Sequence, residues 1–347
     1  MAERVFLHVG TPKSGTTYLQ SVLWQNREQL RADGLLVPGR RLRDHNLAAQ
    51  GLRLDPAAVP GRRAATWKRF LEHVRGWPHD AVISNEWLTR TTPEQAARAL
   101  AALAPAEVHV VVTARDLSAQ APAAWQESVK VGHAASLEEF IVELDSSTAR
   151  WTWASLDPAQ VLETWAGLVP VERLHVVTVP AHGADPALLW QRVGSLLGLL
   201  DPAGYDATRR RTNESLSAEA AALMWRIGPG LREAVTDGGA AGWVEPFRWV
   251  RNYVSHDMLA AYAGSRIALR PAEQDLVSKR SELIAHALIA AGYDLVGDLA
   301  DLRPAAPPTD GRHPGDVTAE EMLALAGRLL ADMLARARAE SQRGGSH

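Results

Sequence analysis

The sequence of 347 residues contains no cysteine, which excludes disulfide bonds, thiolate metal sites and a cysteine nucleophile. It also lacks an uncharged apolar segment long enough to span a bilayer. The apolar run near the N-terminus, residues 5–9, is too short for a signal peptide or a membrane span. We therefore expect a cytoplasmic protein with no membrane-spanning segment.

A strong charge of either sign is missing as well, because the formal net charge is −3. This balance argues against a protein that binds nucleic acid through its overall charge, so we expect no nucleic-acid partner. Lysine is scarce, and the lysines are Lys13, Lys68, Lys130 and Lys279. The composition is otherwise normal for a globular protein, with 46% hydrophobic residues, and the length suffices for one large α/β domain with additions or for two ordinary domains.

Short apolar runs rich in β-branched residues predict buried parallel strands at 5–9, 81–84, 108–112 and 174–179. Between them lie stretches of helical spacing, such as 18–33, 93–103 and 137–144. Strands that alternate with helices predict crossover units. The expected fold class is therefore α/β, with three layers in which helices flank a central parallel β-sheet on both sides.

The second half of the chain is mainly helical by pattern from 216 to about 298, with interruptions expected at Gly228-Pro229-Gly230 and Gly238-Gly239. Residues 303–316 are rich in proline and predict a linker. Beyond it, Thr318 and Glu321 form a capping-box pattern that opens an amphipathic helix over 317–341. The predicted organisation is a domain over 1–302, the linker, and this C-terminal helix, which would pack on the body or mediate a homo-oligomer.

The segment that carries most chemistry is the loop from Gly10 to Thr17, between the first strand and the first helix. Glycines allow a tight turn there, so that successive amides and the helix N-terminus point at an anion. A nucleoside triphosphatase loop would read G-x-x-x-x-G-K-[ST]. Here Thr16 follows the second glycine, and the lysine, Lys13, lies inside the loop. That departure argues against a bound triphosphate with magnesium.

The run T-P-K-S-G-T-T-Y-L-Q, residues 11–20, resembles the 5′-phosphosulfate-binding loop of the sulfotransferase superfamily. The resemblance extends over roughly residues 3–300 and is most specific in this loop. It implies a P-loop-like α/β fold, 3′-phosphoadenosine 5′-phosphosulfate (PAPS) as donor, 3′-phosphoadenosine 5′-phosphate (PAP) as product, and no metal. It also implies that Lys13 binds the bridging oxygen and compensates the charge of the leaving group. The backbone from Ser14 to Thr17 would hold the 5′-phosphate.

A second signature is Arg115, just after the strand at 108–112. In the superfamily an arginine here and a later serine bind the 3′-phosphate of the donor, and a guanidinium at the carboxyl end of a parallel strand suits phosphate. At the usual spacing of the serine this chain has Ala123, so Ser118 is the candidate in its place. The alternative for Arg115 is a surface ion pair with Asp116. The donor-binding set that the resemblance implies is Thr11, Pro12, Lys13, Ser14, Gly15, Thr16, Thr17, Arg115, Ser118 and Arg211.

The candidate general base is Glu86, which follows the strand at 81–84. A hydroxyl acceptor needs a group that takes its proton as sulfur is attacked, and the sequence resembles the branch of the superfamily that uses glutamate. A surface carboxylate or helix cap is the other interpretation. His45 is a weaker candidate for an acid–base or substrate contact. Tryptophans in loops could stack on an acceptor or could simply pack, namely Trp67, Trp77, Trp151, Trp153, Trp243 and Trp249.

These features together predict a PAPS-dependent sulfotransferase that acts on a hydroxyl or amine of a small-molecule or carbohydrate acceptor. Lys13 and Glu86 are the predicted catalytic residues. Two alternatives remain: a P-loop kinase or nucleotide hydrolase, and a non-catalytic nucleotide-binding module of the same fold. The identity of the acceptor cannot be read from the sequence.

Overall fold

The computed structural model describes residues 1–54, 61–147, 149, 151–208, 215–236 and 244–344. The chain forms two compact units, each built from several segments. The first comprises Met1–Gln120, Arg150–Arg211 and Ser278–Ala305, and the second comprises Ala121–Ala149, Thr212–Val277 and Ala306–His347. Helices α6 (Leu117–Val129) and α12 (Pro271–Ala291) run from one set of segments into the other. Arg211, one of the predicted donor-binding residues, lies outside the described residues.

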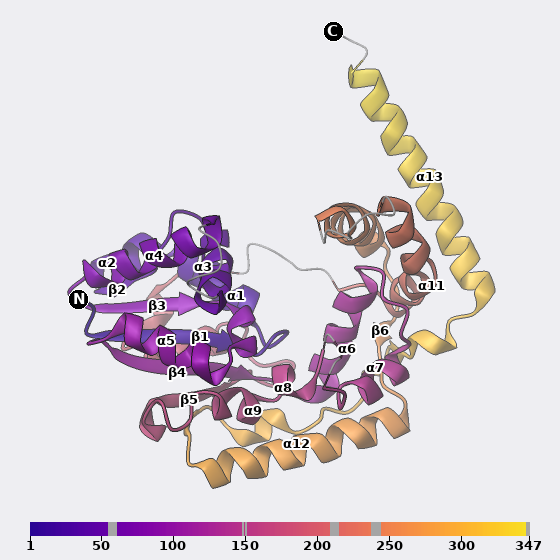
Figure 1. The fold of residues 1–347 in the computed structure, drawn as a ribbon. Coiled ribbons are helices and arrows are strands. Elements are labelled where there is room, and N and C mark those ends of the chain that lie inside the picture. The colour runs from indigo at the N-terminus through magenta and orange to yellow at the C-terminus, as the bar shows by residue number, and fades with distance from the viewer. Residues whose placement is uncertain (55–60, 148, 150, 209–214, 237–243, 345–347) are drawn as a thin grey trace. The chain divides into compact units, whose positions relative to one another are not determined.

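The first unit is built on a six-stranded sheet in the order β2-β3-β1-β4-β5-β7, and all neighbouring strands are parallel (Figure 1). The four strands predicted from apolar runs are confirmed, and the two short edge strands were not predicted. The α/β class with a central parallel sheet is therefore confirmed as well. The strands are β1 (Arg4–Gly10), β2 (Leu35–Leu36), β3 (Asp80–Ser84), β4 (Glu107–Ala114), β5 (Leu174–Thr178) and β7 (Asp294–Val296).

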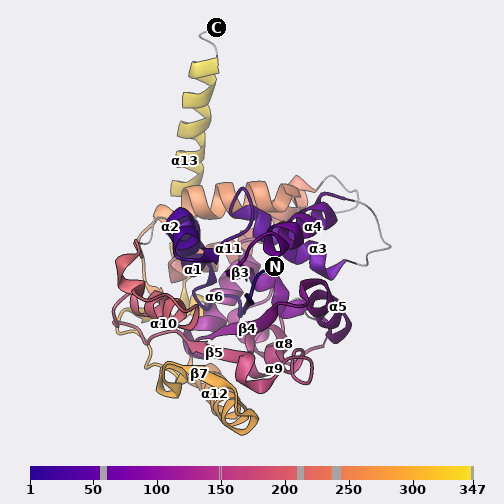
Figure 2. The same ribbon diagram turned by 90° about the vertical axis from the view of Figure 1, so that its left-hand side faces the viewer.

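Helices cover both faces of this sheet (Figure 2). On one face, Phe6, Val82, Val111 and Val177 form a core with apolar side chains of α1, α2 and α10. The predicted helix at 18–33 is divided at Asn26, whose side chain donates to Val22 O. The helices of this unit are α1 (Thr16–Gln25), α2 (Arg27–Ala32), α3 (Arg43–Arg53), α4 (Arg62–Arg75), α5 (Pro93–Leu103), α8 (Trp153–Leu156), α9 (Pro158–Glu163) and α10 (Leu188–Leu196).

The second unit is mainly helical. The interruption expected at Gly228-Pro229-Gly230 is wrong, because α11 continues through it. A Cβ at Gly228 would lie 3.2 Å from Gly132 Cα, so this glycine permits a close backbone contact rather than a break. The other elements are α7 (Leu137–Glu143), α11 (Ala218–Val235), a π-helix η4 (Pro246–Met258), β6 (Arg266–Ile267), β8 (Gly311–Arg312) and α13 (Ala319–Gly344).

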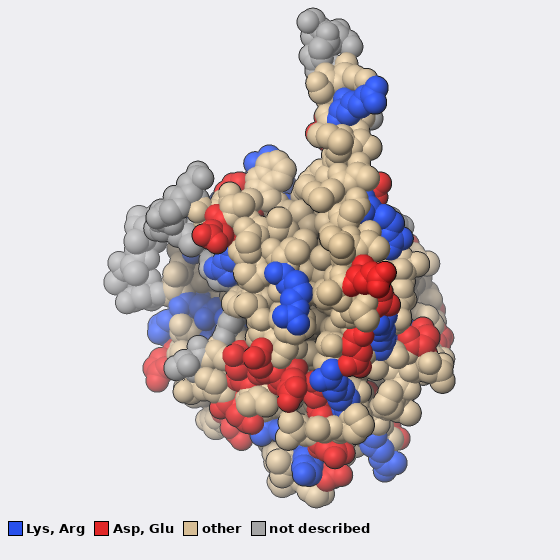
Figure 3. Space-filling view, turned by 90° about the vertical axis from the view of Figure 1, so that its right-hand side faces the viewer, with Lys and Arg blue, Asp and Glu red and all other residues tan. Residues whose placement is uncertain are grey.

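The proline-rich segment 303–316 contains β8, which pairs with β6, and a short 3-10 helix, η7 (Pro314–Asp316). The predicted capping box of α13 is confirmed, since Glu321 N donates to Thr318 Oγ1 and the Glu321 carboxylate accepts from Thr318 N. On this helix Leu325 and Leu329 are buried, as their spacing predicts. On the face of the molecule that Figure 3 shows, acidic and basic side chains are interspersed.

No helix in the described part of the chain combines the length and the apolar character needed to cross a bilayer.

Candidate functional site

The candidate site lies at the carboxyl edge of the sheet in the first unit. Strand β1 is central, and its neighbours are β3 and β4. The segments that follow these three parallel strands therefore meet at one edge, which is where open α/β sheets bind ligands. The loop Thr11–Gly15 follows β1, Glu86 follows β3, and Arg115 follows β4.

The loop after β1 needs two glycines because of its backbone conformation. Gly10 has φ 112° and Gly15 has φ 84°, values that L residues rarely adopt. A Cβ at Gly15 would also lie 2.6 Å from Leu189 Cδ2. Lys13 has φ 64°, so this non-glycine residue also takes the left-handed conformation, at a cost of about 1 kcal/mol.

Two buried side chains from outside the loop fix its position. The Thr113 hydroxyl, near the end of β4, donates to Gly10 O at 3.1 Å and is hydrogen-bonded to Ser14 Oγ. Gln120 of α6 donates from Nε2 to Thr11 Oγ1 at 2.8 Å and to Pro12 O at 2.7 Å. The sequence reasoning gave neither residue a role. Thr113 directly follows the apolar run 110–112 and Gln120 lies between two alanines of α6, but no local pattern marks either residue as a partner of the loop.

Three consecutive amides stand at the junction of the loop and α1. The N–H groups of Ser14, Gly15 and Thr16 have no hydrogen-bond acceptor among the described residues. Thr16 is the first residue of α1, so these amides stand at the positive end of a helix dipole. Amides that face one point at a helix N-terminus suit an anion such as phosphate or sulfate.

Lys13 and Arg115 are brought together by the backbone. Arg115 Nη1 donates to Lys13 O at 2.9 Å, so the arginine supports the loop itself. Both residues are half-buried. Among the described residues no ion pair joins Arg115 to Asp116, the alternative considered from the sequence. The edge of the sheet therefore carries two positive side chains next to the loop amides.

Ser118 has a different neighbour from the one expected. Its hydroxyl donates to Asp116 Oδ2 at 2.6 Å, and its amide donates to Asp116 Oδ1 at 2.8 Å. Asp116 Oδ2 also accepts from Ala305 N. The serine thus forms part of the start of α6.

Glu86 begins the 3-10 helix η1 (Glu86–Arg90), directly after β3. Asn85 caps this helix, because its side chain accepts from Trp87 N at 3.1 Å. The Glu86 carboxylate accepts from Gln20 Nε2 at 3.2 Å, and Gln20 belongs to α1. Helix α1, which begins directly after the loop, therefore also orients the candidate base. Gln20 lies within the quoted motif but had been given no role.

Two histidines near the site are buried. His45 Nδ1 accepts from Ser84 N at 3.2 Å, and its side chain is only 3% exposed. His8 Nδ1 contacts Ser84 Oγ at 2.7 Å. Burial lowers the pKa of each to about 4. His45 is therefore a neutral core residue behind the end of β3, and the structure gives it no access to an acceptor.

Acid should destabilise the fold through these two histidines. Their pKa is about 4 in the folded chain and near 6.5 when unfolded, so the unfolded chain binds more protons between those values. The free energy of unfolding therefore keeps its full value above pH 6.5. It falls as the pH drops toward 4, by about 3 kcal/mol for each histidine. Urea unfolding at pH 7, 6 and 5 measures this loss. His45→Gln should flatten the dependence, and an unchanged slope in that variant would contradict the assignment.

Substitution of Gly15 should destabilise the protein. Gly15→Ala introduces a left-handed alanine and a contact of 2.6 Å with Leu189, for a loss of about 1–3 kcal/mol. The matched control is Gly230→Ala in α11, where an added Cβ meets nothing within 4 Å. Urea unfolding of both variants tests the difference. Equal stability of the two would show that the loop can relax around a side chain.

A separate cavity of about 520 Å³ lies at the opposite edge of the same sheet. Its lining includes Asp33, His79, Asp201 and Tyr205, and no residue of the loop, Glu86 or Arg115. The Tyr205 hydroxyl donates to Asp33 Oδ2 at 2.6 Å. Because ligands of such sheets bind at the carboxyl edge, we place the candidate site at the loop rather than in this cavity.

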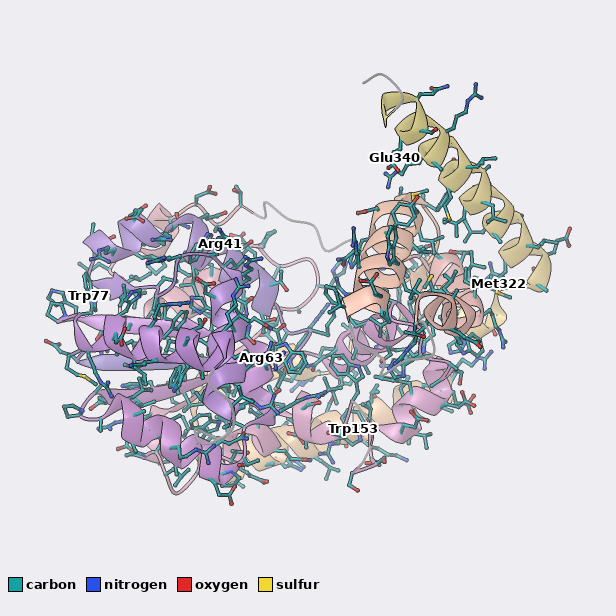
Figure 4. All side chains as sticks on the ribbon, turned by 45° about the horizontal axis from the view of Figure 1, so that its top comes forward. Arg41, Arg63, Trp77, Trp153, Met322 and Glu340 are labelled. Atoms are coloured by element: carbon teal, nitrogen blue, oxygen red, sulfur yellow. The ribbon has the colours of Figure 1, made fainter. Side chains whose placement is uncertain are left out.

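The tryptophans singled out from the sequence have mixed environments. Trp77, which is labelled in Figure 4, precedes β3. Arg31 Cζ lies 4.8 Å from the centroid of its ring. Trp153 is buried, and Trp249 is exposed in the second unit. Trp243 lies outside the described residues. The exposed tryptophan nearest to Glu86 in the chain is its neighbour, Trp87.

Searches against protein-family models, curated proteins and solved structures find no match for this chain.

Proposed function

We propose that this chain is a sulfotransferase that moves a sulfuryl group from PAPS to a hydroxyl or amine. The observation that carries the proposal is the row of three amides, Ser14 to Thr16, with Lys13 in the same loop and Glu86 at the end of the adjacent strand. The finer assignment to the P-loop-like sulfotransferase fold is part of the proposal. So is the placement of the protein in the cytoplasm.

The residues at the carboxyl edge of the sheet fit a donor whose ribose carries phosphate groups at its 5′ and 3′ positions. The three amides and the helix N-terminus would hold the 5′-phosphosulfate. Arg115 would bind the 3′-phosphate, because a guanidinium offers several donors in one plane and suits the geometry of phosphate. When bound, this donor supplies the sulfuryl group that is transferred.

Each side chain then has one task. Glu86, held by Gln20, accepts the proton of the acceptor hydroxyl as its oxygen attacks. The Lys13 ammonium and the loop amides stabilise the negative charge that develops as the bond to sulfur breaks. These groups are positioned before reaction by Thr113 and Gln120. Acceptors consistent with this arrangement include small molecules and carbohydrates.

Isothermal calorimetry with PAP, compared with AMP and with ATP plus magnesium, tests the proposal. We expect PAP to bind most tightly, and Arg115→Ala to weaken PAP more than AMP, which lacks the 3′-phosphate. A preference for ATP with magnesium would favour a kinase or nucleotide hydrolase. PAP binding without conversion of PAPS would favour a non-catalytic module, and no nucleotide binding would overturn the proposal.

A further inference from the structure

Helix α13 is attached to the second unit by one of its faces. Leu325 and Leu329 are buried, and the helix contacts α11 and η4. The Asp332 carboxylate accepts a hydrogen bond from the Tyr262 hydroxyl, and Arg328 Cζ lies 5.3 Å from the centroid of the Tyr262 ring. With about 3.6 residues per turn, these four residues of α13 lie on the same side of the helix. That side is therefore occupied by the chain itself.

The opposite face of α13 is apolar and exposed. Leu323 is 74% exposed, Leu330 is 65% exposed and Leu334 is 73% exposed. Together with Gly327 they follow one another at spacings of four, three and four residues, which is the heptad spacing of a coiled-coil seam. The last turns of the helix extend beyond the other helices of the second unit (Figure 1 and Figure 2). We call these four residues the leucine seam.

Gly327 fits a partner that is itself a helix. A glycine inside a helix lowers helix stability, so its presence in the middle of a 26-residue helix needs a reason. The chain's own packing supplies none in the part that the structure describes, because an added Cβ at Gly327 would meet nothing within 4 Å. In a coiled coil each seam residue of one helix enters a space between residues of the other helix. A glycine provides that space for a large side chain opposite it.

Opposite charges flank the two ends of the leucine seam. Glu320 lies in the first turn of α13, and Arg338 follows it by 18 residues, about five helical turns, so both lie on the same side of the helix. Both side chains are exposed, and neither has an ion pair among the residues that the structure describes. A second copy of the helix that runs in the opposite direction brings its Arg338 to Glu320, and its Glu320 to Arg338. The charges of α13 are therefore complementary to those of an antiparallel copy of itself.

The same antiparallel alignment also matches the apolar residues. Leu323 lies opposite Leu334 of the second copy, and Gly327 lies opposite Leu330 of that copy, whose side chain fills the space that the glycine leaves. A parallel pair would instead place Gly327 opposite Gly327, which leaves a gap in the seam, and would bring like charges together at each end. Packing and charge thus favour the same direction.

We infer that α13 pairs with α13 of a second copy of this chain, antiparallel and through the leucine seam. The product is a dimer with two-fold symmetry, in which the same residues of both copies form the interface. Burial of the exposed leucines drives the association, and the two pairs of Glu320 with Arg338 fix its direction. The inference goes beyond the proposed function and does not depend on it, since no residue of the candidate site takes part.

Sedimentation velocity of the whole protein, over a range of micromolar concentrations, measures the association. We expect a dimer, and Leu330→Glu and Leu334→Glu should each weaken it by about 100-fold or more, because a charge would be buried in the seam. Leu283→Glu is the matched control, since Leu283 is an exposed leucine of α12 and lies outside the seam. Circular dichroism of each variant checks that the helices remain. A protein that stays monomeric, or a dimer that neither seam substitution weakens, would overturn the inference, and binding of the monomer to vesicles of anionic lipid would then assign the seam to a membrane surface.

Cysteine crosslinking tests the direction of the pair, because the chain itself contains no cysteine. Leu323→Cys and Leu334→Cys should form a disulfide-linked dimer only when the two variants are mixed and oxidised. If each variant links to itself instead, the helices are parallel and the proposed arrangement is wrong. Glu320→Arg and Arg338→Glu should each weaken the dimer by about tenfold at low salt, and the double variant should recover most of that loss. A double variant that recovers nothing would contradict the pairing of these two charges.

Discussion

Lys13→Ala should lower the rate of PAP formation from PAPS by about 100- to 1000-fold, the usual effect of removing one preorganised donor that faces developing charge. The lysine lies inside the loop, next to Ser14 and Gly15 in the chain, and under the proposed function its charge would stabilise the group that leaves the sulfuryl. Alanine and lysine carry the same left-handed backbone cost at φ 64°. The change in rate therefore reports the ammonium and not the backbone.

The measurement is PAP release at saturating donor, followed by nucleotide chromatography with a mixture of phenols and acidic saccharides as acceptors. PAP affinity should change by less than tenfold in the variant. Lys279→Ala removes an exposed lysine of α12 and is the matched control. An unchanged rate in Lys13→Ala would remove this lysine from the mechanism, and unfolding curves of both variants exclude a general loss of structure.

The second large effect is expected for Glu86→Gln, with a loss of about 100- to 10,000-fold in acceptor-dependent turnover. Glutamine has nearly the same shape and can still accept from Gln20 Nε2 through its carbonyl oxygen, so the start of η1 should keep its geometry. What it cannot do is take a proton. Binding of PAP should remain within a factor of two of the unsubstituted protein.

Glu94→Gln in the first turn of α5 is the control, because that carboxylate is solvent-exposed and accepts a hydrogen bond from the nearby Thr92 hydroxyl. Turnover is measured with the acceptor that gives the fastest reaction in the mixture. If Glu86→Gln retains full activity, the carboxylate is structural and another group, or water, takes the proton. Gln20→Leu should then also leave turnover unchanged. If Glu86 is the general base, turnover should fall in the Gln20→Leu variant.

The fold could be predicted where the pattern is strong. Four buried strands have near-continuous apolar runs, and each was found at its predicted position. The edge strands β2 and β7 have two and three residues, too few for any periodicity to mark them. The sequence Gly228-Pro229-Gly230 suggested a break because local propensity is poor. Packing of Gly228 against Gly132 outweighs that propensity within α11.

The candidate site could be predicted only in part, for a geometric reason. The loop residues are consecutive and carry a recognisable pattern, and strand ends mark Glu86 and Arg115. The contacts that fix the loop join residues about a hundred positions apart, such as Ser14 and Thr113, and no local pattern reveals them. The partner of Ser118 was missed for a different reason, since the resemblance assigned this serine to the 3′-phosphate whereas its hydroxyl bonds locally to Asp116, two residues earlier.

The bonds from Thr113 and Gln120 to the loop have a consequence for binding kinetics. The loop backbone is held by hydrogen bonds from buried side chains of the protein itself, so part of its ordering entropy is lost when the chain folds. An anion that enters finds the amides of Ser14 to Thr16 in place. Association at this loop should then be a single step whose observed rate rises in proportion to ligand concentration, with no slow phase from loop closure.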